Sequence, residues 1–212
     1  RAWDAGIVVV TAAGNEGAES GGLNLPASDP HVIAVGGVRA IEGGFEVPDW
    51  ASAGDGVRNP DLAAPGAHIQ SLRVPGSDAD LYHPEGHVEN ELLFKGSGSS
   101  QAAAVVAGGA ALLLQADPTL TPDQVKAALV ETATPLAGAA AEQVGHGLLN
   151  LPAAADADVA DARQEWPAAT ATRPLPQPAA VAVNPHWAGA SWAGASWAGA
   201  SWAGASWAGA SW

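Results

Sequence analysis

The sequence predicts an α/β fold for residues 1–155, and three observations support this. Short runs rich in β-branched residues alternate with Ala/Leu-rich segments, and Gly and Pro separate them. Two of the runs are continuously apolar, which is typical of strands buried on both faces of a parallel sheet. One longer segment is apolar on nearly every side, as expected of a helix in the middle of such a domain.

Three strands are expected in this region. Residues 7–13 and 32–38 are the two apolar runs, and their length suits buried strands. Residues 69–73 follow a Pro-Gly turn and form the third. Residues 75–95 are expected to be a surface loop.

Two helices are expected after that loop. The buried helix should cover residues 100–115. The next should run from Thr121 to about Thr132, because Pro122 stands at the first helical position and Gln124 stands three residues after Thr121. That arrangement is a capping box with an N-terminal proline.

The rest of the chain has a different composition. Residues 156–185 are rich in Ala, Pro and Thr and are expected to be a linker. Residues 186–212 contain W-A-G-A-S five times, and this tail is expected to be disordered because its period of five fits neither a helix nor a strand. Evenly spaced Trp rings can also stack on sugars, so contact with a cell surface or wall stays open.

The amino-acid composition argues against several classes of function and partner. The net charge of −14, with only 8 Lys and Arg, argues against nucleic acid as a partner. No Cys is present, which excludes disulfides and thiolate chemistry. No uninterrupted apolar run is long enough for a transmembrane segment. Because the 212 residues contain no Met, we expect the chain to begin inside a longer reading frame.

Two polar residues are candidates for catalysis. Ser100 opens the expected buried helix, where free backbone N–H groups and the helix dipole stabilise negative charge. Asn15 directly follows the first strand, where binding sites occur in α/β sheets. Each has a structural alternative, since Ser commonly caps helices and Asn commonly forms turns.

Four motifs occur in the order found in the subtilisin-like serine proteases, and the first 150 residues resemble the C-terminal half of that catalytic domain. They are A-A-G-N (12–15), L-P-A-S-D-P-H-V-I-A-V-G (25–36), P-D-L-A-A-P-G (60–66) and G-S-S-Q-A-A-A (98–104). The resemblance implies the C-terminal part of a three-layer fold with a mostly parallel sheet. It also implies a serine endopeptidase that acts on polypeptides outside the cell or at its surface.

The resemblance assigns roles to individual residues. Ser100 would be the nucleophile that forms an acyl-enzyme, and Asn15 would stabilise the oxyanion together with the Ser100 N–H. The substrate side chain before the scissile bond would be held by a pocket lined by Ala12, Ala13, Gly14 and Pro26. The Leu25–Pro26 peptide bond is expected to be cis.

The sequence also departs from the family pattern. Ser99 replaces the usual Thr, Ala104 replaces Pro, and Val105 stands where His often follows. The D-[ST]-G and H-G-T-H segments that carry the triad Asp and His do not occur, so we expect them upstream and expect this chain alone to be inactive.

Two other functions remain as alternatives. An α/β-hydrolase esterase fits the approximate nucleophile elbow at residues 98–102, but only His146 and His186 follow it. The other alternative is a non-catalytic fragment that binds a surface through its Trp tail.

No cofactor is expected, although calcium stays an alternative. Oxygen ligands for such a cation could come from an acidic cluster in the 75–95 loop, but it lacks the spacing of a calcium loop. His83 and His87 in that loop are expected to be solvated rather than metal ligands. The cluster comprises Asp78, Asp80, Glu85, Glu89 and Glu91.

Overall fold

The computed structural model describes residues 1–88, 91–160, 163–165, 191–192 and 195–196. Its central sheet contains three parallel strands in the order β1 (Val10–Ala12), β2 (Ile33–Ile41), β4 (Leu62–Pro65). Val10 pairs with Ile33, and Val35 pairs with Leu62. The Ile33, Val35 and Leu62 side chains are fully buried, so the sheet is the centre of the hydrophobic core.

The two apolar runs form strands as predicted, with different ends. The first is shorter than expected, since only residues 10–12 are in β1. The second continues to Ile41, because residues 39–41 form an antiparallel pair with β3 (Gly44–Glu46). Strand β4 was not expected, since its sequence L-A-A-P contains no β-branched residue.

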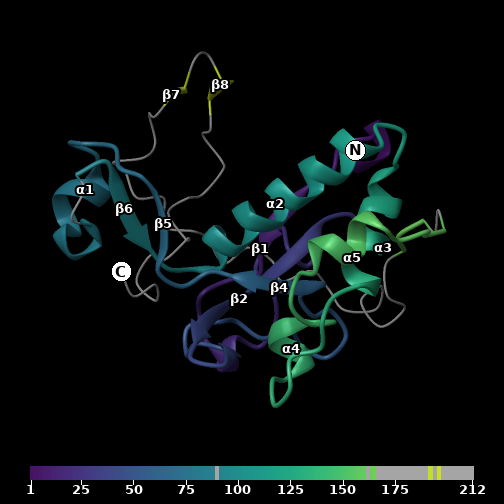
Figure 1. Cartoon of the computed structure of the whole chain (residues 1–212), viewed down its shortest axis with the longest axis horizontal. Helices are drawn as coiled ribbons and strands as arrows, with labels where there is room; N and C mark the ends of the chain where they lie inside the picture. The colour runs from purple at the N-terminus through teal and green to yellow at the C-terminus, as the bar shows by residue number, and fades with distance from the viewer. Residues whose placement is uncertain (89–90, 161–162, 166–190, 193–194, 197–212) are drawn as a thin grey trace.

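Helix α2 (Ser99–Ala116) packs across the sheet (Figure 1). Val106, Ala110 and Leu113 enter the core, as the sequence predicts. The opposite face is exposed, so the expectation of a helix buried on every side is wrong for that face. The exposed positions are Ser100, Ala104, Ala107, Gly108, Ala111, Leu112, Gln115 and Ala116.

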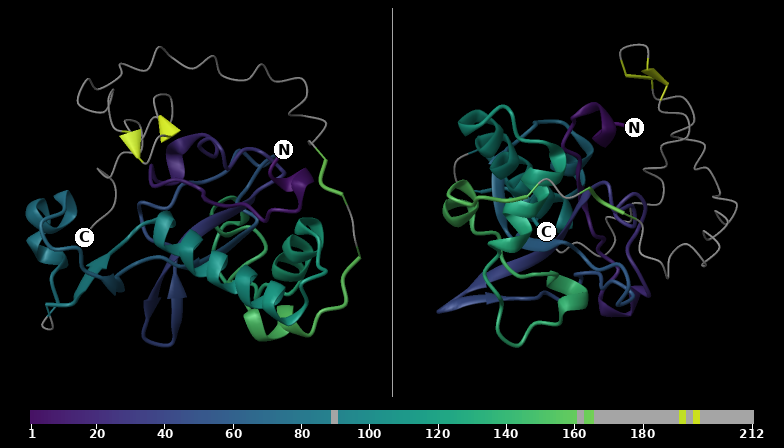
Figure 2. Two further views of the ribbon diagram at one scale, coloured as in Figure 1. Left: turned by 90° about the horizontal axis from the view of Figure 1, so that it is seen from above. Right: turned by 90° about the vertical axis from the view of Figure 1, so that its right-hand side faces the viewer.

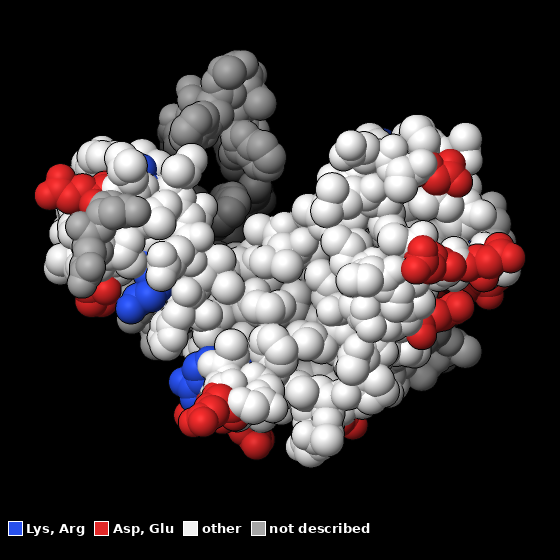
Figure 3. Space-filling model, in the orientation of Figure 1, with Lys and Arg blue, Asp and Glu red and all other residues white. Residues whose placement is uncertain are grey.

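The exposed face of α2 lies within a surface of low charge. In Figure 3 the Asp and Glu side chains lie towards the edges of the view, and the centre that α2 crosses is uncharged. Within the described residues, α2 is also the one helix that is long and apolar enough to cross a membrane by length and composition. Its packing on β1, β2 and β4 is that of a core helix.

Helix α3 (Pro122–Glu131) confirms the predicted capping box. The Gln124 N–H donates to the Thr121 hydroxyl, and the Gln124 side chain accepts from the Thr121 N–H. The short helices α4 (Ala141–Val144) and α5 (Leu151–Ala155) follow, and 3-10 turns lie at Trp3–Ala5 and Ala18–Ser20.

A lobe projects at the amino end of α2 (Figures 1 and 2). It contains β5 (Ile69–Leu72), α1 (Asp78–Tyr82), a 3-10 turn (Pro84–Gly86) and β6 (Leu93–Gly96). The strand expected at residues 69–73 is therefore present, but it pairs with β6 in a separate antiparallel sheet. The expected surface loop is wrong in part, because it contains α1 and β6.

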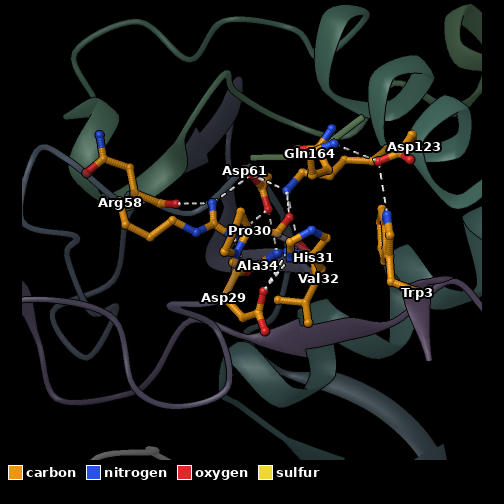
Figure 4. Close-up of polar contacts among 12 residues, drawn as sticks. Trp3, Asp29, Pro30, His31, Val32, Ala34, Arg58, Asp61, Asp123 and Gln164 are labelled. Carbon is orange, nitrogen blue, oxygen red and sulfur yellow. Dashed lines mark hydrogen bonds and ion pairs between the residues drawn. The ribbon is translucent and has the colours of Figure 1, made fainter. Parts of the chain in front are cut away.

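A buried ion network holds the amino ends of β2 and β4 together (Figure 4). Asp61 accepts two bonds from the Arg58 guanidinium at 2.8 and 3.0 Å, and it lies 3.0 Å from Lys126 Nζ. It also accepts from the Ala34 N–H at 2.7 Å. This carboxylate therefore joins the chain before β4, strand β2 and helix α3.

Most of the expected linker and tail lies outside the described residues. In the tail, Ser191–Trp192 (β7) and Ala195–Ser196 (β8) form a short antiparallel pair. The domain limits at 155 and 185 stay predictions.

Candidate active site

Asn15 lies at the carboxyl end of β1, three residues beyond the strand. The backbone turns there at Gly14, whose φ of 127° favours glycine. A Cβ on Gly14 would lie 2.5 Å from Glu16 Oε2 and 2.7 Å from Ser52 Oγ. The A-A-G-N sequence therefore needs its glycine for both backbone angle and space.

Ser99, the first residue of α2, binds Asn15 directly. Its N–H donates to Asn15 Oδ1 at 2.8 Å, and its hydroxyl lies 2.8 Å from the same oxygen. The hydroxyl also lies 3.0 Å from the Gly14 carbonyl oxygen and accepts from the Gly14 N–H at 3.2 Å. Ser99 is fully buried. It therefore connects the end of β1 to the start of α2.

These bonds fix which end of the Asn15 amide is free. Because the Ser99 N–H and hydroxyl both face Oδ1, the Nδ2 group is the end that remains to donate. Nδ2 has no acceptor among the described residues, and the same holds for the Ser100 N–H. The next two amides of α2, those of Gln101 and Ala102, both donate to the Gly98 carbonyl.

Ser100 is exposed, in contrast to the buried serine before it. The free Ser100 N–H and Asn15 Nδ2 lie at the amino end of an 18-residue helix, where the dipole favours negative charge. Two such donors can stabilise an oxyanion. The family resemblance implies that Asn15 and the Ser100 N–H stabilise an oxyanion together. The structure brings Asn15 to the start of α2, but its hydrogen bonds go to Ser99.

Gly66 and Ser97 hold the start of α2 from the other side. The Gly98 N–H donates to the Gly66 carbonyl at 2.7 Å, and Ser97 Oγ accepts from the His68 N–H at 2.9 Å. Gly66 directly follows β4, in the P-D-L-A-A-P-G segment. The ends of β1 and β4 thus both position the Ser99–Ser100 pair.

The residues expected to line a pocket differ in exposure. Ala12 and Gly14 are half-buried, Pro26 is exposed, and Ala13 is fully buried. Ala13 meets the Pro26 loop through its backbone, because its carbonyl accepts from the Asn24 N–H at 3.4 Å. The Leu25–Pro26 peptide bond is cis, as predicted.

Three polar side chains beside Gly14 were not singled out from the sequence. Glu16 Oε2 accepts from the Ser52 hydroxyl at 2.8 Å and from the Asn15 N–H at 2.9 Å. Asn24 Nδ2 would lie 3.2 Å from a Cβ on Gly14. Ser52 is 36 residues from Glu16 along the chain, so no local motif could have indicated this cluster.

No histidine side chain is hydrogen-bonded to Ser100 in the described part of the chain. His31 lies 3.1 Å from Asp29, and His83 lies 3.1 Å from Glu85. His87 lies 2.8 Å from Asp80, and its side chain is 34% exposed. These residues do not form a triad with Ser100.

The acidic cluster of the lobe is organised around an ion pair. Asp80 is buried and accepts from Arg73 Nε and from the Gly76 N–H. The Arg73 guanidinium and the Gly76 N–H hold the Asp80 pKa well below its usual range. Among the described residues, which exclude Glu89, no group of three or more His, Asp and Glu is arranged to hold a metal.

Residues 1–147 match the family model for the subtilase family of peptidases. The chain is 42% identical over 133 residues to serine protease AprX of Bacillus subtilis, an alignment covering 59% of this chain and 30% of AprX. It is 38% identical over 157 residues to subtilisin E of Bacillus subtilis, covering 73% of this chain and 35% of the relative.

The fold matches the crystal structure of fervidolysin from Fervidobacterium pennivorans, a keratinolytic enzyme related to subtilisin. The TM-score is 0.60 at 32% identity, and the match covers 74% of this chain and 23% of fervidolysin. The chain thus spans about a third of the length of the curated relatives it matches. On its motifs, its fold and these matches, the chain belongs to the subtilase family.

Proposed function

We propose that this chain supplies the nucleophile and the oxyanion site of a serine endopeptidase. Ser100 attacks the scissile carbonyl to form an acyl-enzyme. Asn15 Nδ2 and the Ser100 N–H bind the oxygen that becomes negative. Ala12, Gly14 and the Pro26 turn, supported from behind by the buried Ala13, form the wall beside the substrate side chain that precedes the scissile bond. The substrate is a polypeptide.

The observation that carries this proposal is that the two adjacent serines, Ser99 and Ser100, differ in exposure and in hydrogen bonding. The Ser99 hydroxyl is buried and surrounded by Gly14 and Asn15, so it cannot reach a substrate. Ser100 is exposed, and its N–H and Asn15 Nδ2 have no acceptor among the residues that the structure describes. The nucleophile is therefore the second serine, and the first orients the oxyanion asparagine.

The test compares Ser100→Ala with Ser99→Ala in the product of the complete reading frame. A fluorophosphonate probe measures labelling of the activated serine, and a chromogenic peptide measures turnover. We expect Ser100→Ala to abolish labelling and Ser99→Ala to keep it with a lower kcat, because the Asn15 amide then loses an orienting donor. Loss of labelling in Ser99→Ala together with normal labelling of Ser100→Ala would reverse the assignment.

The 212-residue chain by itself should be inactive. No His reaches Ser100 in the described residues, and an unactivated serine is a weak nucleophile at neutral pH. Labelling of the isolated chain at the rate of the complete product would show that a general base lies within it.

We also propose that the protein acts outside the cell or at its surface, because it is similar to fervidolysin, a keratinolytic enzyme. We further propose that the Trp-rich tail, residues 186–212, contacts that surface. The proposed activity requires no calcium. Fractionation of producing cells, with and without residues 186–212, tests both points. Activity confined to the cytoplasm would refute the location, and unchanged surface retention without the tail would refute the contact.

A further inference from the structure

The lobe is joined rigidly to the residues that carry the proposed nucleophile. Strand β6 ends at Gly96, four residues before Ser100, and the three residues between them are buried. The His68 N–H, just before β5, donates to Ser97 Oγ at 2.9 Å. Both strands of the lobe are therefore tied to the segment that leads into α2, as Figures 1 and 2 show. A surface on these strands keeps a fixed position relative to Ser100.

The hairpin of β5 and β6 is covered on one face. Consecutive side chains of a strand point to opposite faces, and directly paired residues share a face. Arg73, just beyond β5, is bonded to Asp80 of α1. On β6, the Phe94 ring lies 5.8 Å from the His87 ring, which follows the 3-10 turn. Helix α1 and the 3-10 turn therefore cover the face to which Arg73 and Phe94 point, and they leave the opposite face open.

The open face carries two cross-strand pairs. Leu72 is paired with Leu93, and their side chains share this face. Gln70 is paired with Lys95, and these side chains share it too. Leu72 is 79% exposed, so the leucine pair presents an apolar surface to solvent. Exposed apolar surface of this kind is a common place of contact with another chain.

Lys95 adds a positive charge to the open face, at the end nearer to Ser100. Its ammonium group has no ion pair or hydrogen bond in the part of the chain that the structure describes. The other cation of the lobe, Arg73, is neutralised by Asp80. With a net charge of −14, most of the protein surface repels an acidic group. Lys95 therefore marks a place beside the nucleophile where a carboxylate is attracted.

We propose that the open face, formed by Gln70, Leu72, Leu93 and Lys95, binds the part of the substrate polypeptide that follows the scissile bond. This inference rests on the proposed function. The wall proposed for the preceding side chain lies at the end of β1, whereas the lobe follows the end of β4, on the other side of the start of α2. A polypeptide that crosses Ser100 from that wall continues over the lobe.

The spacing of the open face specifies a pattern in the substrate. A strand rises about 3.3 Å per residue, so Lys95 and Leu93 lie about 7 Å apart along β6. Side chains two residues apart in an extended polypeptide have the same separation. Lys95 is nearer to Ser100 along the chain, so it contacts an acidic side chain. The Leu72–Leu93 pair contacts an apolar side chain two residues further from the scissile bond.

The test uses the product of the complete reading frame and two kinds of substrate. A chromogenic peptide with a nitroaniline leaving group has no residue after the scissile bond and cannot reach the open face. Internally quenched peptides extend well beyond that bond, with Glu and Leu two residues apart at positions shifted by one residue at a time. Turnover of the chromogenic peptide and labelling of Ser100 are established first. Their absence would overturn the proposed function, and this inference with it.

The measured quantity is kcat/KM on a long peptide divided by kcat/KM on the chromogenic peptide. In the wild type this ratio should peak at one position of the Glu and Leu pair. Leu72→Ser should lower the peak about 5- to 10-fold, because the substrate leucine loses its apolar contact. Tyr82→Ser is the matched control, since Tyr82 is 74% exposed on α1, which covers the other face. It should keep the wild-type ratio.

Lys95→Glu adds a test by charge exchange. It should lower the ratio about threefold for the peptide with Glu and raise it for the same peptide with Lys at that position, as expected of an exposed ion pair. The inference is wrong if the wild-type ratio does not depend on the position of the pair, or if Leu72→Ser matches Tyr82→Ser. It is also wrong if Lys95→Glu lowers the ratio for both peptides, because that result indicates a structural role.

Discussion

Two carboxylates, Asp61 in the body and Asp80 in the lobe, each have two nitrogen-bearing side chains and a backbone N–H around them: Arg58 and Lys126 for Asp61, and Arg73 and His87 for Asp80. Asp61 is bonded to groups 27 residues before it and 65 residues after it, at Ala34 and Lys126. Within the described part of the chain, the side-chain and backbone donors on Asp80 all lie within seven residues of it. The first network therefore fixes tertiary structure, and the second fixes only the lobe.

The charged side chains of the Asp61 network are almost completely buried. The Asp61, Arg58 and Lys126 side chains are 11%, 11% and 7% exposed, and Lys126 also donates to the carbonyls of Pro30 and Val32 at 2.9 Å. Burial lowers the Lys126 pKa, with Arg58 acting in the same direction and Asp61 against it. These charges depend on one another because water cannot replace a lost partner.

The largest expected effect is that of Asp61→Asn. This change leaves the Arg58 and Lys126 charges buried without their anion, which costs about 3–5 kcal/mol in comparable buried pairs. The free energy of unfolding, from chemical denaturation, should fall by that amount. A loss no larger than that of Asp80→Asn would show that the two networks are equivalent.

Lys126→Met should have a smaller effect, about 1–3 kcal/mol. The Asp61 carboxylate keeps Arg58 and the Ala34 N–H, but the carbonyls of Pro30 and Val32 lose their donor. Stability of the wild type should also rise with pH between the lowered folded pKa of Lys126 and its usual value near 10.4, since the unfolded chain then binds more protons. This Lys126 contribution to the slope should vanish in Lys126→Met.

Thr121→Ala tests the helix that carries Lys126. Loss of the side-chain acceptor for the Gln124 N–H should lower stability by about 1 kcal/mol. Thermal unfolding measures this, with Thr121→Ser as the control that keeps the hydroxyl. An equal loss in Thr121→Ser would mean that the methyl group rather than the cap is responsible.

The smallest effect on global stability should come from Asp80, and it should be confined to the lobe. Because the folded pKa of Asp80 lies below its usual value near 3.9, its contribution is present above about pH 4 and is lost as the pH falls further. Hydrogen exchange in residues 76–88 should accelerate below that pH before exchange in α2 does. In Asp80→Asn it should be fast at neutral pH, and unchanged protection there would contradict the assignment.

The sequence by itself determined the α/β class, the two main apolar strands, the capping box of α3 and the family. These follow from patterns read over a few adjacent residues, such as the Thr121 to Gln124 spacing or the A-A-G-N turn with its required Gly14. A pattern of adjacent residues is enough to predict such features because their physical cause is local: a backbone angle at one residue, or a hydrogen bond between residues three positions apart.

Tertiary structure alone decided the rest. Strand β4 forms because its backbone pairs with that of β2 in the parallel sheet. The sequence L-A-A-P does not itself favour a strand. The Ser99–Asn15 bonds, the Ser52–Glu16 pair and the Lys126–Asp61 contact join residues 84, 36 and 65 positions apart. The identity of the free donor on Asn15 depends on which groups the fold brings to its other end. No spacing along the chain encodes that, because it is a property of packing.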